Sequence, residues 1–298
     1  MQAMQEAIRK AKALIEPMPY IRAFRDKIVV VKLGGAAMED PATMGCVLDD
    51  VVFLEAVGVK PIVVHGGGPA ISREMKRRKI EPKFVLGQRV TDEATMEIVR
   101  EVLVNRINAE ILRTLEDLGG HGAPFADPDR GALRARRRIV RREKPDGSVE
   151  EFDMGLVGDM ESIDADMFRQ TLASRAVPVV APIARGPDGE ALNVNADIAA
   201  SFVAGELRAE KAVFLTDTHG IRTDPEDPDS HASTLTLTHI DDLVRTGVIS
   251  GGMLPKVDAC RAALAKGVRK AHIIDGRLQH ALLLEIFTDE GVGTQIVQ

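Results

Sequence analysis

The sequence predicts an α/β protein: a three-layer αβα sandwich with an open, mostly parallel central sheet. From Ile28 onward, apolar strand-like runs alternate with helical patterns. The runs are rich in Val and Ile without polar alternation, which is typical of parallel strands buried on both faces. No repeat at a fixed period is present, so a solenoid or propeller is not indicated.

The elements follow in order along the chain. We expect buried strands in IVVVKLGG, PIVVHGGG, VPVVAPI, AVFLTD and KAHIID (28–35, 61–68, 177–183, 212–217 and 270–275). Helical patterns follow the first two strands, one running through about Val57 and one covering 70–79. Residues 94–119 form a long amphipathic pattern and predict a single helix.

Residues 1–16 place apolar side chains at helical spacing, and Pro17 and Pro19 should end this helix. Because the stripe precedes the first strand, it either contacts a partner or docks on the core of its own chain. A mitochondrial presequence is an alternative reading, but Glu6 and Glu16 argue against it.

Composition excludes several classes of protein. The 298 residues are 45% hydrophobic and 28% charged, with a net charge of −6, so no overall attraction to nucleic acid or anionic lipid is expected. No apolar run is long enough to span a membrane. Cys46 and Cys260 fit no metal spacing and suit a reduced, cytoplasmic chain.

The arginine-rich run RARRRIVRREKPDGSVEEF (134–152) has two interpretations. Its arginines resemble a nucleic-acid patch. However, Pro145, Asp146 and Gly147 form a turn signal, and Glu150 and Glu151 return opposite the arginines. A surface hairpin with opposed charges is therefore the favoured reading, and the absence of Trp weakens base stacking further.

Two strand ends carry glycines, in KLGG (32–35) and HGGG (65–68). Glycine lets the backbone turn sharply and bring N–H groups close to a ligand, and a helix that begins there favours an anion. Lys32 places a cation at one of these turns. GxxxxGK[ST] is absent and neither stretch matches GxGxxG, which disfavours a P-loop or a dinucleotide fold.

A second polar group lies downstream, in NVNAD (193–197), TDTHG (216–220) and SGGMLPK (250–256). Asn195 or Asp197 could cap the helix that follows. Lys256 repeats the pattern of Lys32, in which a cation lies beside a glycine pair and a helix start.

Seven segments in order along the chain resemble the acetylglutamate kinases of the amino acid kinase family. They are VVKLGGAAM, VVHGGGPAI, GQRVTDEATM, LNVNADIAA, FLTDTHGI, GGMLPKVDAC and LLLEIFTDEGVGTQI. Related kinases of aspartate, glutamate, carbamate and uridylate share the glycine and lysine segments but not RVTDEATM with NVNAD. The resemblance implies the family fold and the phosphorylation of N-acetyl-L-glutamate by ATP, the second step of arginine synthesis by the acetylated route.

The resemblance also implies roles for individual residues. Lys32 and Lys256 would flank the transferring phosphoryl group, and Asp197 would orient both lysines. The remaining residues would bind substrate (Gly67, Gly68, Arg89 and Asn193) or ATP (Gly34, Gly35, Thr216 and Asp217). Mg²⁺ would bridge the ATP phosphates, and most of its other ligands would be water. No residue of the protein is assigned as a metal ligand.

The N-terminal helix, PYIRAFRDK (19–27) and the tail from His280 resemble the arginine-inhibited branch. There, helices interlace into a hexamer built as a trimer of dimers, and L-arginine binds beside the helix. The residues carried over are Tyr20, Lys211, His272, Glu285 and Gly291, although Glu285 could be merely an exposed helix residue. Residues 1–19 would be an oligomerisation helix, 20–186 the substrate lobe and 187–298 the ATP lobe.

Two segments depart from the family pattern. APFADPDRG (123–131) stands where the family has a Gly/Ser-rich turn, and His219 is unusual at its position. Two rival functions stay open: a kinase of a related acylated amino dicarboxylate, and a non-catalytic arginine-sensing subunit. Retention of Lys32, Asp197 and Lys256 argues against the second.

Overall fold

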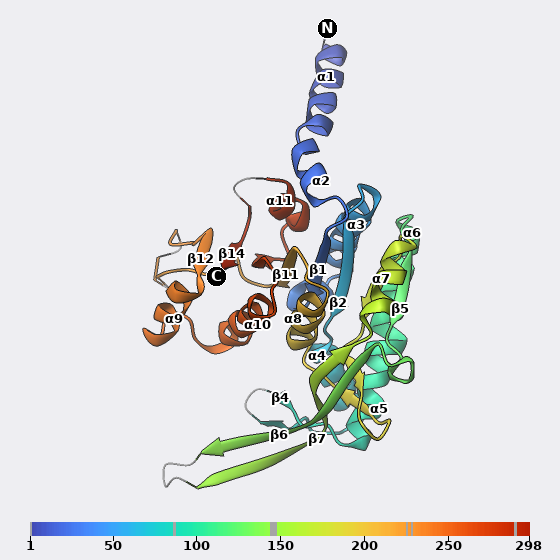
Figure 1. The fold of residues 1–298 in the computed structure, drawn as a ribbon, viewed down its shortest axis with the longest axis vertical. Coiled ribbons are helices and arrows are strands. Elements are labelled where there is room, and N and C mark those ends of the chain that lie inside the picture. Colours follow the sequence, from blue (N-terminus) through green and yellow to red (C-terminus); the bar gives the residue numbers. More distant parts are fainter. Residues whose placement is uncertain (1, 86–87, 144–147, 225, 228, 289–290) are drawn as a thin grey trace.

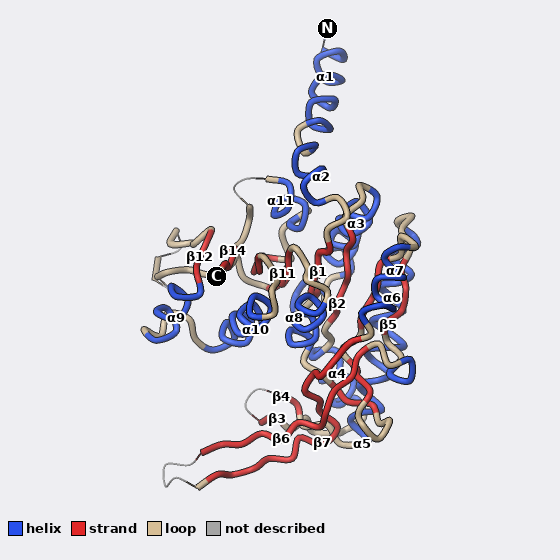
Figure 2. The backbone as a smooth tube through the Cα atoms, viewed as in Figure 1, coloured by secondary structure: helices blue, strands red, loops and turns tan. Residues whose placement is uncertain are grey.

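The computed structural model describes residues 2–85, 88–143, 148–224, 226–227, 229–288 and 291–298. A central sheet lies between two layers of helices, a long hairpin projects from one end, and the N-terminal helix extends from the other (Figures 1 and 2). The α/β class and the three-layer arrangement are thus confirmed.

The described residues build an eight-stranded sheet in the order β12-β14-β13-β11-β1-β2-β8-β5. Neighbouring strands from β13 to β5 run parallel, whereas β14 is antiparallel to β13. The strands are β1 Ile28–Leu33, β2 Lys60–His65, β5 Gly122–Phe125, β8 Val177–Val180, β11 Lys211–Thr216, β12 Thr234–Thr236, β13 Lys270–Asp275 and β14 Thr294–Val297. All five predicted strands are present.

The helices cover both faces because the central strands of the sheet are apolar on both sides. Val29 and Val31 of β1 pack into one core, and Val30 packs into the other. The first core is covered by α3 Pro41–Ala56, α6 Ala109–Asp117 and α11 Ala281–Phe287. The second is covered by α7 Ala165–Ala173, α8 Ala196–Glu206, α9 Leu237–Arg245 and α10 Leu254–Ala265.

The long helix predicted over 94–119 is continuous but contains a π-helical segment that the sequence pattern does not indicate. It consists of α5 Glu93–Arg100, the π-helix Glu101–Asn108 and α6. The π segment lies against the HGGG turn: a Cβ added to Gly67 would come within 2.4 Å of Leu103 and 2.9 Å of Ile107. Packing therefore favours glycine at this position, because any side chain would displace Leu103 and Ile107.

The arginine-rich run forms the predicted hairpin. β6 Leu133–Glu143 pairs antiparallel with β7 Val149–Ile163, and a second sheet adds β9 Ile183–Arg185 and β10 Ala191–Asn193. Arg138 lies 2.9 Å from Asp159, and Arg141 lies 2.8 Å from Glu151. The predicted Pro145–Gly147 turn lies outside the described residues. Opposed charges across the hairpin favour the surface reading over a nucleic-acid patch.

The unusual segment 123–131 is a part of the core. Its first residues form the edge strand β5, and a short 3₁₀ turn, Pro128–Arg130, follows. Phe125 is buried, and its ring lies 4.4 Å from that of Phe168. The apolar residues of this segment therefore fill space beneath the sheet edge.

The N-terminal helix α1 spans Gln2–Ile15 and ends before Pro17, as predicted. Pro19, also expected to end this helix, lies in the first turn of the next one, α2 Met18–Phe24. Apolar side chains of α1 stay exposed: Met4 at 66%, Ile8 at 49% and Leu14 at 75%. Docking on the core of the same chain is therefore wrong as an interpretation of this stripe. Among the described helices, none has the length and hydrophobicity that crossing a membrane requires.

A buried histidine connects the end of β2 to the π-helix and to β8. His65 is fully buried, with Nε2 3.1 Å from Nδ2 of Asn108 and Nδ1 3.0 Å from the carbonyl oxygen of Gly66. Asn108 also donates to the carbonyl of Val179 at 3.0 Å. These contacts assign the proton to Nδ1, because Nε2 accepts from Asn108. Burial lowers the pKa of His65 to about 4.

His65 should therefore reduce the acid stability of the protein. An ordinary histidine has a pKa of about 6.5 in the unfolded chain. The stability from the neutral ring is present above pH 6.5 and is lost as the pH falls through 4, by about 3 kcal/mol in total. We predict that His65→Gln flattens the fall in unfolding free energy over this range, measured by urea titration. His239→Gln, at an exposed position, should keep the wild-type slope; equal slopes for all three proteins would contradict the assignment.

Candidate active site

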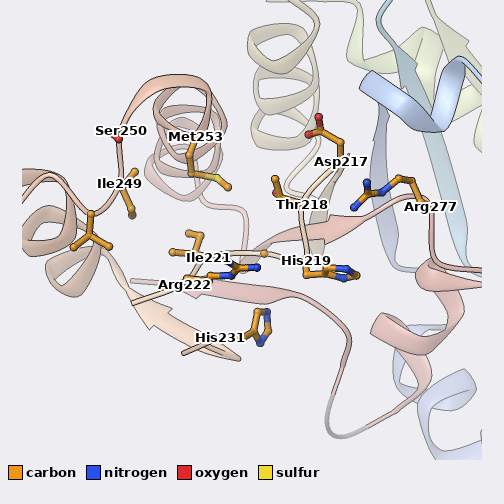
Figure 3. A pocket seen from close by; sticks show the side chains of 12 residues that line it. Asp217, Thr218, His219, Ile221, Arg222, His231, Ile249, Ser250, Met253 and Arg277 are labelled. Carbon is orange, nitrogen blue, oxygen red and sulfur yellow. The ribbon is translucent and has the colours of Figure 1, made fainter. Parts of the chain in front are cut away.

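Two cavities open at the carboxyl edge of the central sheet, where open α/β sheets bind ligands. The first, here called the glycine cleft, has a volume of about 280 Å³ and is lined by Lys32, Gly35, Gly67, Gly68, Arg89, Asn193 and Asp197, among others. The second, the β11–β13 cavity, has about 510 Å³ (Figure 3). Of the residues predicted to bind substrate or ATP or to act in catalysis, the first cavity holds Lys32, Gly35, Gly67, Gly68, Arg89, Asn193 and Asp197, and the second holds Asp217. Gly34, Thr216 and Lys256 line neither cavity.

Lys32 lies in the glycine cleft, at the point where β1 leaves the core. Its Nζ lies 2.8 Å from Oδ1 of Asp197, as an ion pair without hydrogen-bond alignment, and both side chains are less than one fifth exposed. The lysine folds back over Gly34: a Cβ on Gly34 would lie 2.1 Å from the same Nζ. Gly34 is thus buried beneath the lysine instead of lining the cleft.

Two helix N-termini converge on the glycine cleft. Helix α4 Gly68–Arg77 begins directly after Gly67, and α8 begins at Ala196. Asn195 caps α8 by accepting from the N–H groups of Asp197 and Ile198. Both termini carry positive potential toward the cleft and favour an anionic guest.

The turn after β1 differs from the expectation of a helix start. Gly35–Met38 form a short 3₁₀ segment, and α3 begins only at Pro41, where Asp40 accepts from the N–H of Thr43. Gly35 adopts φ +57°, a conformation that glycine takes without strain. This turn therefore offers a glycine backbone next to Lys32, without the dipole of a long helix.

Arg89 belongs to a short hairpin, β3 Phe84–Val85 with β4 Gln88–Arg89, that borders the glycine cleft. It donates to Ser72 Oγ at 2.7 Å and to the carbonyl of Gly68 at 3.2 Å, and its guanidinium stacks on Phe84. Burial lowers the pKa of Arg89, but an arginine stays charged. None of these partners carries a negative charge, so Arg89 can still bind a carboxylate.

Asn193 also reaches the cleft, from β10. Its amide donates to Thr91 Oγ1 at 3.2 Å. Thr91 is fully buried, so this hydrogen bond fixes the amide of Asn193 to the protein interior.

Lys256 occupies the first turn of α10, just after the 3₁₀ turn Gly251–Met253. Its Nζ lies 3.4 Å from Oδ1 of Asp217, so Lys256 pairs with this carboxylate and not with Asp197 as expected. Helices α8 and α10 nevertheless pack together, because Ser201 Oγ lies 2.7 Å from the carbonyl of Asp197 and 2.8 Å from that of Ala259. Lys32 on β1 and Lys256 on α10 therefore lie on two elements that both contact α8.

The β11–β13 cavity has a polar mouth and an apolar wall (Figure 3). Asp217 lines it, whereas Thr216 is buried behind and donates to Oδ1 of Asp217 at 3.1 Å. A backbone hydrogen bond within Asp217, the Thr216 hydroxyl and Lys256 together lower the pKa of Asp217. Sequence reasoning missed Arg277 and the apolar wall. One signal could have indicated this region. The strand KAHIID ends in Asp275 as AVFLTD ends in Asp217, and parallel strands place such ends at the same edge of the sheet.

The residues predicted to bind arginine lie together at another place in the fold. His272 Nδ1 lies 2.5 Å from Oε1 of Glu285, and Oε2 accepts from the N–H groups of Val292 and Gly293. Lys211 Nζ donates to the carbonyl of Glu285 at 3.3 Å. Glu285 is 6% exposed, so the reading of an exposed helix residue is wrong.

This cluster has unusual protonation properties. Burial lowers the pKa of Lys211 to about 8, and burial also lowers the pKa of His272, whose Nε2 is buried without a partner among the described residues. Gly291 closes on the cluster: with φ +64°, an added Cβ would lie 2.9 Å from Glu285 Oε2. Tyr20 is partly exposed on α2. The same helix contacts the cluster through Phe24, whose ring centroid lies 5.1 Å from Lys211 Nζ.

Metal ligands do not cluster in the part of the chain that the structure describes: no three His, Cys, Asp or Glu side chains there could hold an ion together. The carboxylates nearest the two cavities, Asp197 and Asp217, each face a lysine. This donor set suits a metal ion that arrives bound to a ligand's own oxygen atoms.

Comparison with known proteins agrees with this geometry. Residues 27–275 match the model of the amino acid kinase family. The acetylglutamate kinase of Symbiobacterium thermophilum is 46% identical over 294 residues, which is 99% of each chain. That of Moorella thermoacetica is 44% identical over 290 residues, or 97% of this chain and 98% of the relative.

A solved structure also resembles this one. N-acetylglutamate synthase from Neisseria gonorrhoeae superposes with a TM-score of 0.82 at 25% identity, over 97% of this chain but 63% of that longer chain. The family model covers most of the sequence, and the two relatives are far above the identity at which membership is in doubt. This chain therefore belongs to the amino acid kinase family, among the acetylglutamate kinases.

Proposed function

We propose that the protein transfers the γ-phosphoryl group of ATP to the γ-carboxylate of N-acetyl-L-glutamate. The observation that carries this proposal is the glycine cleft: two helix N-termini, Lys32 and Arg89 surround one cavity at the carboxyl edge of the sheet. A small dicarboxylate is the ligand that such a set of fixed positive charges favours.

The chemistry requires charge stabilisation and no general base. The attacking carboxylate has a pKa of about 4.3 and is already ionised at neutral pH. Its approach to a polyphosphate is opposed by repulsion, which Lys32 and the N–H groups at Gly35, Gly67 and Gly68 would offset at the transferring group. Arg89, with Asn193, would hold the α-carboxylate of the acid through its fork of donors.

The nucleotide would bind in the β11–β13 cavity, which Asp217 lines and beside which Lys256 pairs with that carboxylate. Magnesium would arrive on the phosphates and neutralise part of their charge. In this arrangement residues 20–186 supply most of the acid site and 187–298 the nucleotide site. Asp197, in the first turn of α8, contributes to the glycine cleft from the second lobe.

Release of ADP in the presence of N-acetylglutamate tests the proposal directly. We expect turnover with N-acetyl-L-glutamate and much less with N-acetyl-L-aminoadipate, because one extra methylene displaces the attacking carboxylate from Lys32. Preference for the longer acid would favour the rival kinase. Absence of turnover with either acid, together with arginine binding, would favour a non-catalytic sensing subunit.

Lys32→Ala should lower kcat by about 100- to 1,000-fold, since a fixed donor to the transition state contributes on this order. The KM for N-acetylglutamate should change little, because the main interaction forms only as the phosphoryl group moves. Steady-state kinetics measures both constants. Wild-type turnover in this variant would remove Lys32 from the mechanism.

Gly34→Ala tests the positioning of Lys32 without removing it. The new Cβ would occupy the place of the ammonium group, so Lys32 must leave Asp197, and kcat should fall by about 100-fold. The melting temperature should stay nearly constant, because the clash involves the free end of a flexible side chain. Gly45→Ala in α3 meets nothing within 4 Å and should keep wild-type kinetics. Equal kcat values for the two variants would refute this role of Gly34.

We further propose that L-arginine inhibits the enzyme by binding at Tyr20, Lys211, His272, Glu285 and Gly291. The buried Glu285 carboxylate supports this proposal, because it is a natural partner for a guanidinium group. The exposed apolar stripe of α1 supports assembly into hexamers through the N-terminal helices. Removal of residues 1–19 should leave dimers that do not respond to arginine.

The stripe of α1 can be tested by a single charge. Ile8→Glu places a carboxylate in the apolar face, and we expect dimers in place of hexamers by light scattering, with weaker inhibition by arginine. Lys10→Glu changes the charge on the opposite face of the same helix and should leave the assembly intact. Hexamers in the Ile8→Glu protein would contradict the proposed interface.

A further inference from the structure

Three strand ends meet beside the β11–β13 cavity, and one of them brings a cation that the proposed mechanism does not use. The turn after β13 packs on the turns of its neighbours. Gly276 donates its N–H to the carbonyl of Thr216 at 2.9 Å, and a Cβ on Gly276 would lie 2.8 Å from that of Ala37. Arg277 follows directly, so its backbone is fixed next to the ends of β11 and β1.

The side chain of Arg277 is held by a buried carboxylate. Its Nε lies 2.9 Å from Oδ1 of Asp275 and its Nη2 lies 2.7 Å from Oδ2, while the Asp275 side chain is 3% exposed. Burial alone would raise the pKa of Asp275, but the hydrogen bonds from Arg277 lower it overall, so the carboxylate is ionised. His219 shares this anchor, with Nδ1 3.3 Å from Oδ2.

Anchoring leaves part of the guanidinium available. An arginine carries five N–H donors, and two side-chain nitrogens of Arg277 contact Asp275. No described residue accepts from Nη1, and Arg277 lines the β11–β13 cavity with half of its side chain exposed. In Figure 3 the guanidinium points toward Thr218, near Asp217.

We propose that Arg277, fixed by Asp275, binds the polyphosphate of the nucleotide on the side away from the transferring group. This inference rests on the nucleotide site proposed above. Along the edge, the strands follow the order β2, β1, β11, β13, about 4.8 Å apart. The acid cleft lies at β2 and β1, so a polyphosphate that starts at Lys32 and continues past Asp217 reaches the end of β13.

The walls of the cavity favour this direction. Ile221 and Ile249 are buried, and Met253 lies near them, so the apolar side suits a base. Arg222 lies beside Ile221, while two cations paired with carboxylates lie toward the opposite, polar side: Lys256 beside Asp217 and Arg277 beside Asp275. A guanidinium with a fixed fork and free donors is well matched to phosphate oxygens.

Calorimetric titration with Mg·ADP tests the proposal without an acceptor acid. Arg277→Ala should weaken Mg·ADP binding by about 10- to 100-fold, as expected for hydrogen bonds to a charged group. Arg277→Lys keeps the charge and should recover part of this loss. Arg277→Ala should lower the melting temperature, because the buried Asp275 carboxylate loses its main partner, whereas Arg277→Lys should keep most of it. The KM for N-acetylglutamate should stay at the wild-type value in both variants.

Arg269→Ala is the matched control, since Arg269 precedes the same strand at its other end and pairs with Glu210 at 3.2 Å. It should bind Mg·ADP as the wild type does. Wild-type affinity in Arg277→Ala, a lysine variant as weak as the alanine variant, or an equal loss in Arg269→Ala would overturn the proposal. Because no acid is present, these results stand apart from the ADP-release assay, whose failure would instead overturn the proposed reaction.

Discussion

The ion pair between Lys32 and Asp197 is the interaction on which the arrangement of the site depends. Lys32 ends the central strand β1, which is buried on both faces, and Asp197 begins the helix that covers one face. The ammonium group of Lys32 occupies the space that a side chain at position 34 would fill, and Gly34 leaves that space open. The pair therefore couples strand, turn and helix at the position of the proposed phosphoryl transfer.

Positive charge is distributed along the sheet edge in the order of the strands. The N-terminus of α4 and Arg89 lie at β2, Lys32 at β1, Lys256 beside the end of β11, and Arg277 at the end of β13. Within the part of the chain that the structure describes, Lys32, Lys256 and Arg277 each pair with one carboxylate, so each cation is positioned without being fully neutralised. This is how a chain with a net charge of −6 can bind anions: the attraction is local.

The proposed arginine site and the cavity proposed to bind the nucleotide both lie on strands β11 and β13. Lys211 is the first residue of β11 and Thr216 the last, while His272 and Asp275 lie on β13. Both strands are almost entirely buried and pair along their whole length, so they form a rigid connection between the two places. Glu285 joins β13 to α11 and to the segment at Val292, which ties the C-terminal tail into this unit.

Local sequence pattern determined β1, β2, β8, β11 and β13, the N-terminal helix, the arginine-rich hairpin and the glycine turns, because burial on both faces and tight turns restrict residue type wherever they occur. It did not indicate the other three strands of the central sheet, β5, β12 and β14. Tertiary structure decided the rest. The partner of Lys256, the π-helix against Gly67, the core role of 123–131 and the anchoring of Arg277 all depend on residues far apart in the chain. Such contacts arise only when strands and helices pack, so no local pattern records them.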